Sequence, residues 1–79
     1  MSQTANNAII ALVNSAYLER IPQSAREHAT TASCALIERE YPDLYQAAET
    51  ENPLSDAVKE QLSTIVNQLF EQRMAKHHF

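Results

Sequence analysis

The hydrophobic residues in the last third of the chain recur every three or four positions, which is the spacing of one side of an α-helix. They are Leu54, Val58, Leu62, Ile65, Val66, Leu69 and Phe70. At about 100° per residue this stripe covers roughly 160° of the helix, which is wide enough to contact two neighbouring helices. Arg73 continues the middle of the stripe, although its side chain is charged. The pattern predicts a helix over about residues 53–76, with Asn52 or Ser55 as its N-cap.

A second helical pattern occupies the start of the chain and predicts a helix over about residues 4–20. Its apolar side consists of Ala5, Ile9, Leu12, Val13 and Ala16. Pro22 follows this segment, and the residue before a proline avoids helical backbone angles. We therefore expect the first helix to end near Arg20.

The segment after Pro22 predicts a helix over about residues 24–41. Ser24 and Glu27 have the spacing of a capping box, in which each side chain bonds the backbone amide of the other residue. A narrow stripe on one side favours the close approach of a neighbouring helix, because most of its side chains are small. This stripe consists of Ala25, Ala29, Ala32 and Leu36. The other side carries Cys34, Ile37 and Tyr41. Two apolar sides predict a helix sandwiched between neighbours, one of which we expect from a second chain.

Pro42 predicts the start of a short helix over about residues 43–48, because proline suits the first position of a helix. Residues 49–52 are polar and predict a loop. The chain has no glycine, the residue that hairpins and tight turns use at left-handed backbone positions. The sequence therefore predicts one all-α domain over residues 1–79, a bundle of three long helices and one short helix with no β-sheet.

A chain of 79 residues has a thin core, because a small domain buries only roughly 60% of the surface of its unfolded chain. Cys34 is the only cysteine, so no disulfide within the chain adds stability. Self-association is another way to bury apolar surface. We expect a homodimer whose contact includes Cys34, Ile37, Tyr41 and Phe70.

The cellular compartment follows from three sequence features. A lone cysteine suits a reducing compartment. The first residues lack the basic start of a signal peptide, and no apolar run has the length of a membrane span. We therefore expect a cytoplasmic protein.

Acidic side chains are concentrated in the middle of the chain, where no basic residue lies between Arg39 and Lys59. The net charge of −4 argues against nonspecific binding of nucleic acid. The acidic stretch either keeps the protein soluble or docks a basic surface of another protein. In the second case Tyr45 is the expected aromatic anchor. The expected partner-binding residues are Glu38, Glu40, Asp43, Tyr45, Glu49 and Glu51.

The residue types of catalytic and metal sites are present, but their spacing matches neither kind of site. Cys34 has no histidine three or four residues away, which favours a small buried side chain over a nucleophile. His28, His77 and His78 form no metal-binding spacing with each other or with Cys34. We therefore expect no catalytic residue, no metal and no cofactor.

The function that we expect is noncatalytic: a small adapter, regulator or stoichiometric inhibitor acting by protein–protein contact, as is common among small acidic proteins of bacteria and phages. A helix-turn-helix regulator is the first alternative, but its recognition helix needs exposed basic residues, and glutamates flank Arg26 and Arg39.

A small enzyme or a carrier domain is the second alternative. A carrier serine stands in an Asp-Ser-Leu setting, whereas Ser24 and Ser55 stand in Gln-Ser-Ala and Leu-Ser-Asp.

Overall fold

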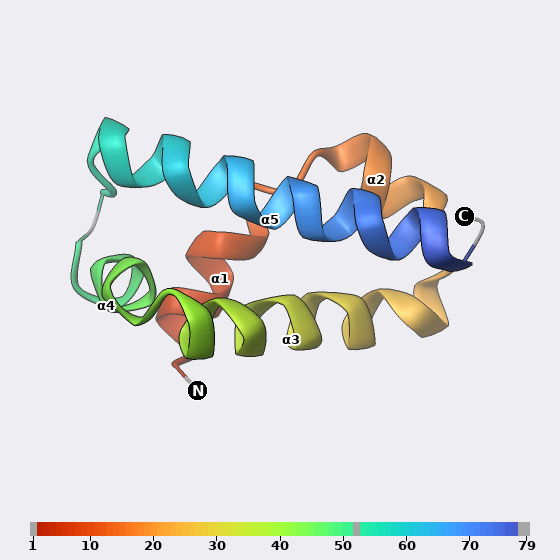
Figure 1. Ribbon diagram of the computed structural model, residues 1–79, viewed down its shortest axis with the longest axis horizontal. Coiled ribbons are helices and arrows are strands. Elements are labelled where there is room, and N and C mark those ends of the chain that lie inside the picture. The colour runs from red at the N-terminus through yellow and green to blue at the C-terminus, as the bar shows by residue number, and fades with distance from the viewer. Residues whose placement is uncertain (1, 52, 78–79) are drawn as a thin grey trace.

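Two long helices, α3 (Gln23–Glu40) and α5 (Asp56–His77), form the frame of the molecule and run in opposite directions (Figure 1). The computed structural model describes residues 2–51 and 53–77, with only the backbone of the last of these. The described residues contain helices and connections but no strand. The all-α fold predicted from the absence of glycine is therefore confirmed.

Three short helices complete the described part of the fold: α1 (Gln3–Ile10), α2 (Ser15–Arg20) and α4 (Pro42–Thr50). Figure 1 shows α4 across one end of the α3–α5 pair, with α1 behind the pair and α2 beside the C-terminal half of α5. The most extensive packing joins α1 to α4, and both also contact α3 and α5. Four helices thus enclose one core.

The first helix, predicted over residues 4–20, is two helices, because the chain turns at Leu12 and Val13. The backbone N–H groups of these two residues bond carbonyls three positions back instead of four, at 3.0 and 3.1 Å, and such tighter bonds commonly close a helix end. Asn14 then caps α2, since its Oδ1 accepts a hydrogen bond from the Ala16 N–H at 3.0 Å. The prediction of one long helix is therefore wrong.

Asn67 of α5 bridges this break in the first helix. Its Oδ1 accepts from the backbone N–H of Asn14 at 2.7 Å, and its Nδ2 donates to the Leu12 carbonyl at 3.0 Å. Nδ2 also donates to the Ser63 carbonyl at 2.7 Å, which orients the amide. A side-chain amide is both donor and acceptor, so one residue satisfies two backbone groups that the break leaves without helical partners.

The turn between α2 and α3 confirms the role of Pro22 and corrects the predicted cap. Ile21 is extended before the proline, as a residue in that position prefers. The Pro22 carbonyl already accepts from the Arg26 N–H at 3.0 Å, so α3 begins at Gln23. Ser24 therefore lies inside the first turn, and the predicted capping box is wrong.

Helix α4 begins at Pro42 as predicted, but it is longer than predicted. The N–H of Glu51 still bonds the Ala47 carbonyl at 2.8 Å, so the helix continues to Thr50. Glu49, expected in a loop, belongs to the last turn of α4.

Helix α5 begins later than the predicted residue 53, at Asp56. Of the two predicted caps, Asn52 lies outside the described residues. Ser55 caps the helix: its Oγ accepts from the Val58 N–H at 3.3 Å, and its carbonyl accepts from the Lys59 N–H at 2.9 Å.

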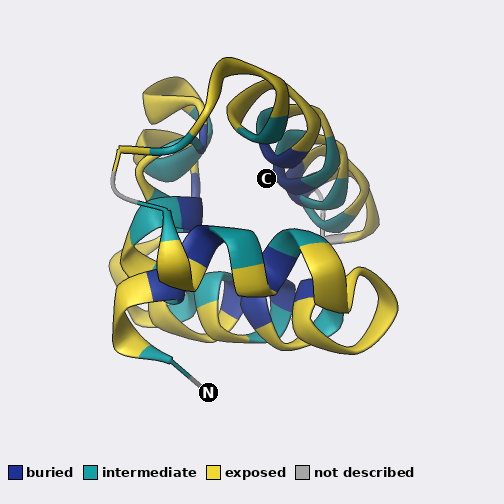
Figure 2. Ribbon diagram, turned by 90° about the vertical axis from the view of Figure 1, so that its left-hand side faces the viewer, coloured by how far each residue is buried: buried dark blue, intermediate teal, exposed yellow. Residues whose placement is uncertain are grey.

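The core lies between the inner sides of the helices, where the buried positions face one another (Figure 2). Its hydrophobic members are Ala5, Ile9, Val13, Ile21, Ala29, Cys34, Ile37, Tyr45, Ala48, Leu62, Val66, Phe70 and Met74. The stripe predicted on the last helix supplies Leu62, Val66 and Phe70. The break after α1 lets Val13 enter the same core.

Replacing Asn67 with alanine should lower the free energy of unfolding by about 1–3 kcal/mol, because the Leu12 carbonyl and the Asn14 N–H lose their partner. Urea denaturation followed by circular dichroism measures the change. Asn7→Ala is the matched control, since Asn7 is exposed on α1 and its loss should change stability by less than about 0.5 kcal/mol. Equal losses in the two variants would contradict the bridging role of Asn67.

Candidate functional site

Tyr45, the expected docking anchor, is part of the core, with 4% of its surface exposed. Its hydroxyl donates to Asn6 Oδ1 at 2.7 Å and accepts from the Ser2 backbone N–H at 2.9 Å. Burial raises the pKa of this hydroxyl, and the negative charges of Glu38 and Glu49 add to the rise. Tyr45 therefore ties the start of the chain to α4, and the expectation that its ring lies on the surface is wrong.

Tyr41, and not Tyr45, is the tyrosine that is exposed on the surface. It lies at the junction of α3 and α4, and 42% of its surface is exposed. Among the described residues it is the one large hydrophobic side chain with such exposure. The chain leaves the helical path at Tyr41 before Pro42, and this change of direction places the ring outside the core.

Three carboxylates lie on the two helices that meet at this junction, and we call Glu38, Tyr41, Asp43 and Glu49 the acidic corner. Glu38 is in the last turn of α3, and Asp43 and Glu49 are in the first and last turns of α4. The negative charges of Glu38 and Glu49 both raise the pKa of the Tyr45 hydroxyl, so each lies within electrostatic range of that residue. Asp43 suits the N-terminus of a helix, but a carboxylate in the last turn opposes the helix dipole. Helix electrostatics therefore do not explain Glu38 and Glu49.

The other two expected partner-binding acids have partners within the chain. Glu40 Oε1 lies 3.2 Å from Arg39 Nε, and the two side chains form an ion pair. Both side chains are exposed, so this pair adds little stability. Glu51 is half-buried, and its Oε1 accepts from the Ser55 N–H at 3.1 Å at the start of α5. Glu51 therefore serves the local fold, and the expected partner-binding acids without such a partner are Glu38, Asp43 and Glu49.

The residues expected to form a dimer contact are mostly inside the chain's own core. Cys34, Ile37 and Phe70 expose no more than 1% of their surface, whereas Tyr41 is on the outside. The side of α3 that carries Cys34 and Ile37 is covered by helices of the same chain, so a second chain is not needed to cover it. These three residues form no contact surface for a second copy, and the homodimer stays a prediction without a defined interface.

Cys34 is a buried thiol that lies against α1. Its Sγ is 4.0 Å from the Asn6 carbonyl, and its residue exposure is 1%. Burial raises the pKa of the thiol from 9.0 to about 11, because desolvation disfavours the thiolate. A nucleophilic cysteine needs a lowered pKa and access to substrate, so this geometry suits a packing role.

The arginines of the candidate recognition helix do not form a basic stripe. Arg26 is half-buried, and its Nη2 donates to the Ile21 carbonyl at 3.2 Å. Arg39 pairs with Glu40. Two other cations, Arg73 and Lys76, line a cavity between α3 and α5 together with Ser33. The sequence singled out Arg73 but not Ser33, because a serine on a helix carries no signal of its environment.

Among the described residues, no three side chains of the metal-ligating types gather into a group. His28 is exposed on α3, His77 ends α5, and His78 lies outside the described residues. The described helices include none with the length and apolar character needed to cross a bilayer. Comparisons of the chain with protein-family models, curated proteins and solved structures gave no match.

Replacing Tyr45 with phenylalanine should lower the free energy of unfolding by about 1–2 kcal/mol, because the Ser2 N–H and the Asn6 amide lose the hydroxyl between them. Thermal and urea denaturation measure this loss. Tyr41→Phe removes the exposed hydroxyl of the neighbouring tyrosine and should leave stability unchanged. A Tyr45→Phe variant as stable as Tyr41→Phe would contradict the structural role of Tyr45.

Replacing Cys34 with alanine should leave the fold intact and cost about 1–2 kcal/mol near neutral pH, because a buried side chain is trimmed. The pKa of the thiol is higher in the folded chain, so its stabilising contribution is complete below pH 9 and is lost as the pH rises to about 11. The stability difference between the native protein and Cys34→Ala should therefore shrink over this range in urea denaturation. A constant difference would show that the thiol is not desolvated.

Proposed function

We propose that the protein is a noncatalytic binding module whose acidic corner docks a basic surface of another protein. The observation that carries this proposal is the exposed ring of Tyr41 among carboxylates that have no ion-pair partner in the described chain. Tyrosine is enriched among the residues that dominate binding energy at interfaces. Its ring supplies apolar contact area and its hydroxyl a hydrogen bond.

The charges of the acidic corner support a basic partner over an acidic or neutral one. Glu38, Asp43 and Glu49 carry charges of the same sign on two adjoining helices, and a positive surface attracts all three. Such charges act mainly on the rate of encounter, because they attract the partner before contact forms. Tyr41 then contributes to the lifetime of the complex. The proposal therefore assigns steering to the carboxylates and anchoring to the ring.

The alternative that the acidic corner only keeps the protein soluble makes a different prediction. Solubility depends on net charge, so any two exposed glutamates should then be equivalent. Glu19 on α2 and Glu27 near the start of α3 are exposed and outside the acidic corner. A double reversal at these positions changes the net charge by the same amount as a double reversal at Glu38 and Glu49.

The test uses a synthetic arginine-rich peptide as probe and amide NMR shifts as the readout. We expect the shifts to concentrate at the acidic corner and the affinity to fall with rising salt. Tyr41→Ala should weaken binding at least about fivefold, which corresponds to a loss of about 1 kcal/mol. Glu38→Lys with Glu49→Lys should weaken binding more than Glu19→Lys with Glu27→Lys. Equal effects of the two double reversals, with no effect of Tyr41→Ala, would leave net charge as the explanation.

A further inference from the structure

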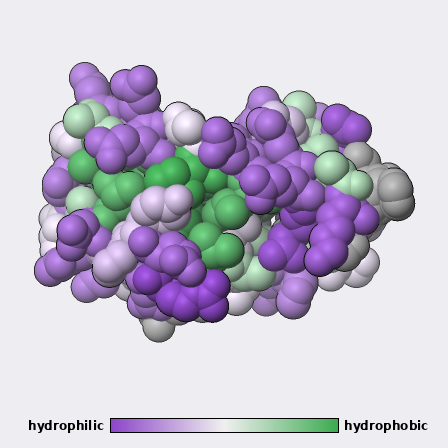
Figure 3. All heavy atoms as spheres, viewed as in Figure 1, coloured by the Kyte–Doolittle hydropathy of each residue, from purple (hydrophilic) through white to green (hydrophobic). Residues whose placement is uncertain are grey.

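We propose that the cavity between α3 and α5 binds a small amphiphilic carboxylate. The cavity has a volume of about 190 Å³. On the face seen in Figure 3, hydrophobic side chains gather between these two helices, and hydrophilic ones cover the end on the right. The cavity takes residues from both helices and none from α4, so this site is distinct from the acidic corner.

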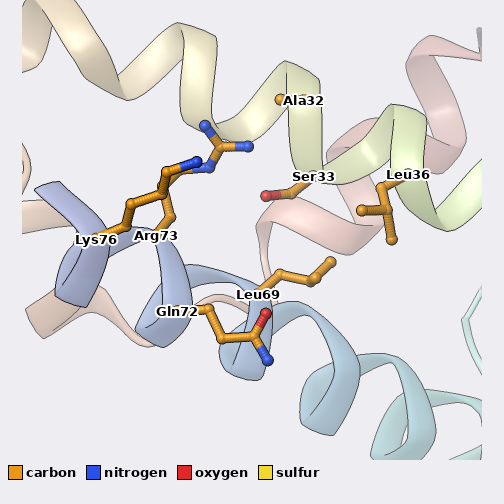
Figure 4. A pocket seen from close by; sticks show the side chains of 7 residues that line it. All are labelled: Ala32, Ser33, Leu36, Leu69, Gln72, Arg73 and Lys76. Atoms are coloured by element: carbon orange, nitrogen blue, oxygen red, sulfur yellow. The ribbon is translucent and has the colours of Figure 1, made fainter.

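Ser33 is the first observation that points to a ligand. Only 2% of its surface is exposed, and its Oγ has no hydrogen-bond partner in the described chain. A buried hydroxyl without a partner costs stability, and alanine at this position would avoid the cost. Figure 4 shows the hydroxyl directed into the space between the helices, toward the end where Arg73 lies. A ligand oxygen in that space supplies the missing partner.

Two cations at the same end of the cavity are the second observation. Arg73 and Lys76 are one helical turn apart on α5, and both side chains extend toward α3 (Figure 4). Neither has a carboxylate within ion-pair distance among the described residues, although the chain carries an excess of acids. Arg73 is half-buried on the otherwise apolar side of α5. Lys76 is exposed beside it, and two like charges one helical turn apart favour an anion between them.

The other residues that line the cavity indicate the chemistry of the part of the ligand that does not contact the cations. Leu36 and Leu69 line the cavity from opposite helices; as seen from the cations, Leu36 lies beyond Ser33 and Leu69 lies across from it (Figure 4). The amide of Gln72 adds a further polar group beside them. The planar guanidinium of Arg73 matches a carboxylate, which it binds through two parallel hydrogen bonds. The ligand that fits has a carboxylate at the cationic end and a short hydrocarbon part between the leucines.

The size of the cavity limits the length of that hydrocarbon part. Sites for drug-sized ligands measure about 300–1,000 Å³, and this cavity is smaller. A chain of a few carbon atoms therefore fits better than a long acyl chain. Hexanoate is a suitable probe, and hexanol is its uncharged counterpart of nearly the same shape.

Titration of the isotope-labelled native protein with hexanoate tests the site without any substitution. We expect saturable shifts of the backbone amides of Ser33, Gln72 and Arg73, and at least tenfold weaker binding of hexanol, because the cations contribute only to the carboxylate. Equal binding of hexanol would overturn the assignment of the head group. The absence of saturable shifts at these residues up to tens of millimolar hexanoate would overturn the site.

Two variants then separate binding from stability. Ser33→Ala should be at least as stable as the native protein without ligand, because it removes the unpartnered hydroxyl, yet should bind hexanoate several-fold more weakly. Arg73→Gln should weaken binding at least tenfold. Arg39→Gln is the matched control, because Arg39 pairs with Glu40 away from the cavity, and it should keep the native affinity. Undiminished binding by both Ser33→Ala and Arg73→Gln would contradict the proposal.

Discussion

The amide of Asn67 is the interaction on which the arrangement of the short helices depends. A continuous helix over residues 4–20 would be about 25 Å long and would keep one direction. Asn67 instead holds the Leu12 carbonyl and the Asn14 N–H at a break. The two halves then separate: α1 packs against α4, while α2 meets the end of α5, where the Tyr17 hydroxyl donates to Glu71 at 2.7 Å. The hydrogen bonds of Asn67 thus let the two halves of the predicted helix pack against different helices, α4 and α5.

The polar side chains of this small domain differ in how far the fold explains their presence. Asn67 and Tyr45 each bond several backbone or side-chain groups, so their presence is explained by the fold. Ser33 has no such partner, and Glu38 and Glu49 stand where the helix dipole disfavours them. Residues that the fold does not explain are the natural place to look for function. They lie in two places, the acidic corner and the α3–α5 cavity, which have charges of opposite sign.

Sequence reasoning located the acidic stretch but not the composition of the site. It placed Tyr45 on the surface as a docking anchor, whereas the structure buries Tyr45 and leaves Tyr41 exposed. Both tyrosines lie within three residues of Pro42, and the local pattern did not show which of them is buried. The partners of the Tyr45 hydroxyl, Ser2 and Asn6, are about forty positions earlier in the chain. Burial of one ring over the other depends on that distant contact.

The sequence by itself determined the all-α class, the turn at Pro22, the start of α4 at Pro42 and most of the core side of α5. These features depend on residues a few positions apart: backbone restrictions at proline, the lack of glycine and hydrophobic period. Tertiary structure alone decided where the first helix breaks, which carboxylates are free and whether Ser33 has a partner. Each of these features depends on groups that folding brings together, such as Asn14 and Asn67, which are 53 positions apart in the chain. The local spacing of residues does not predict such pairs.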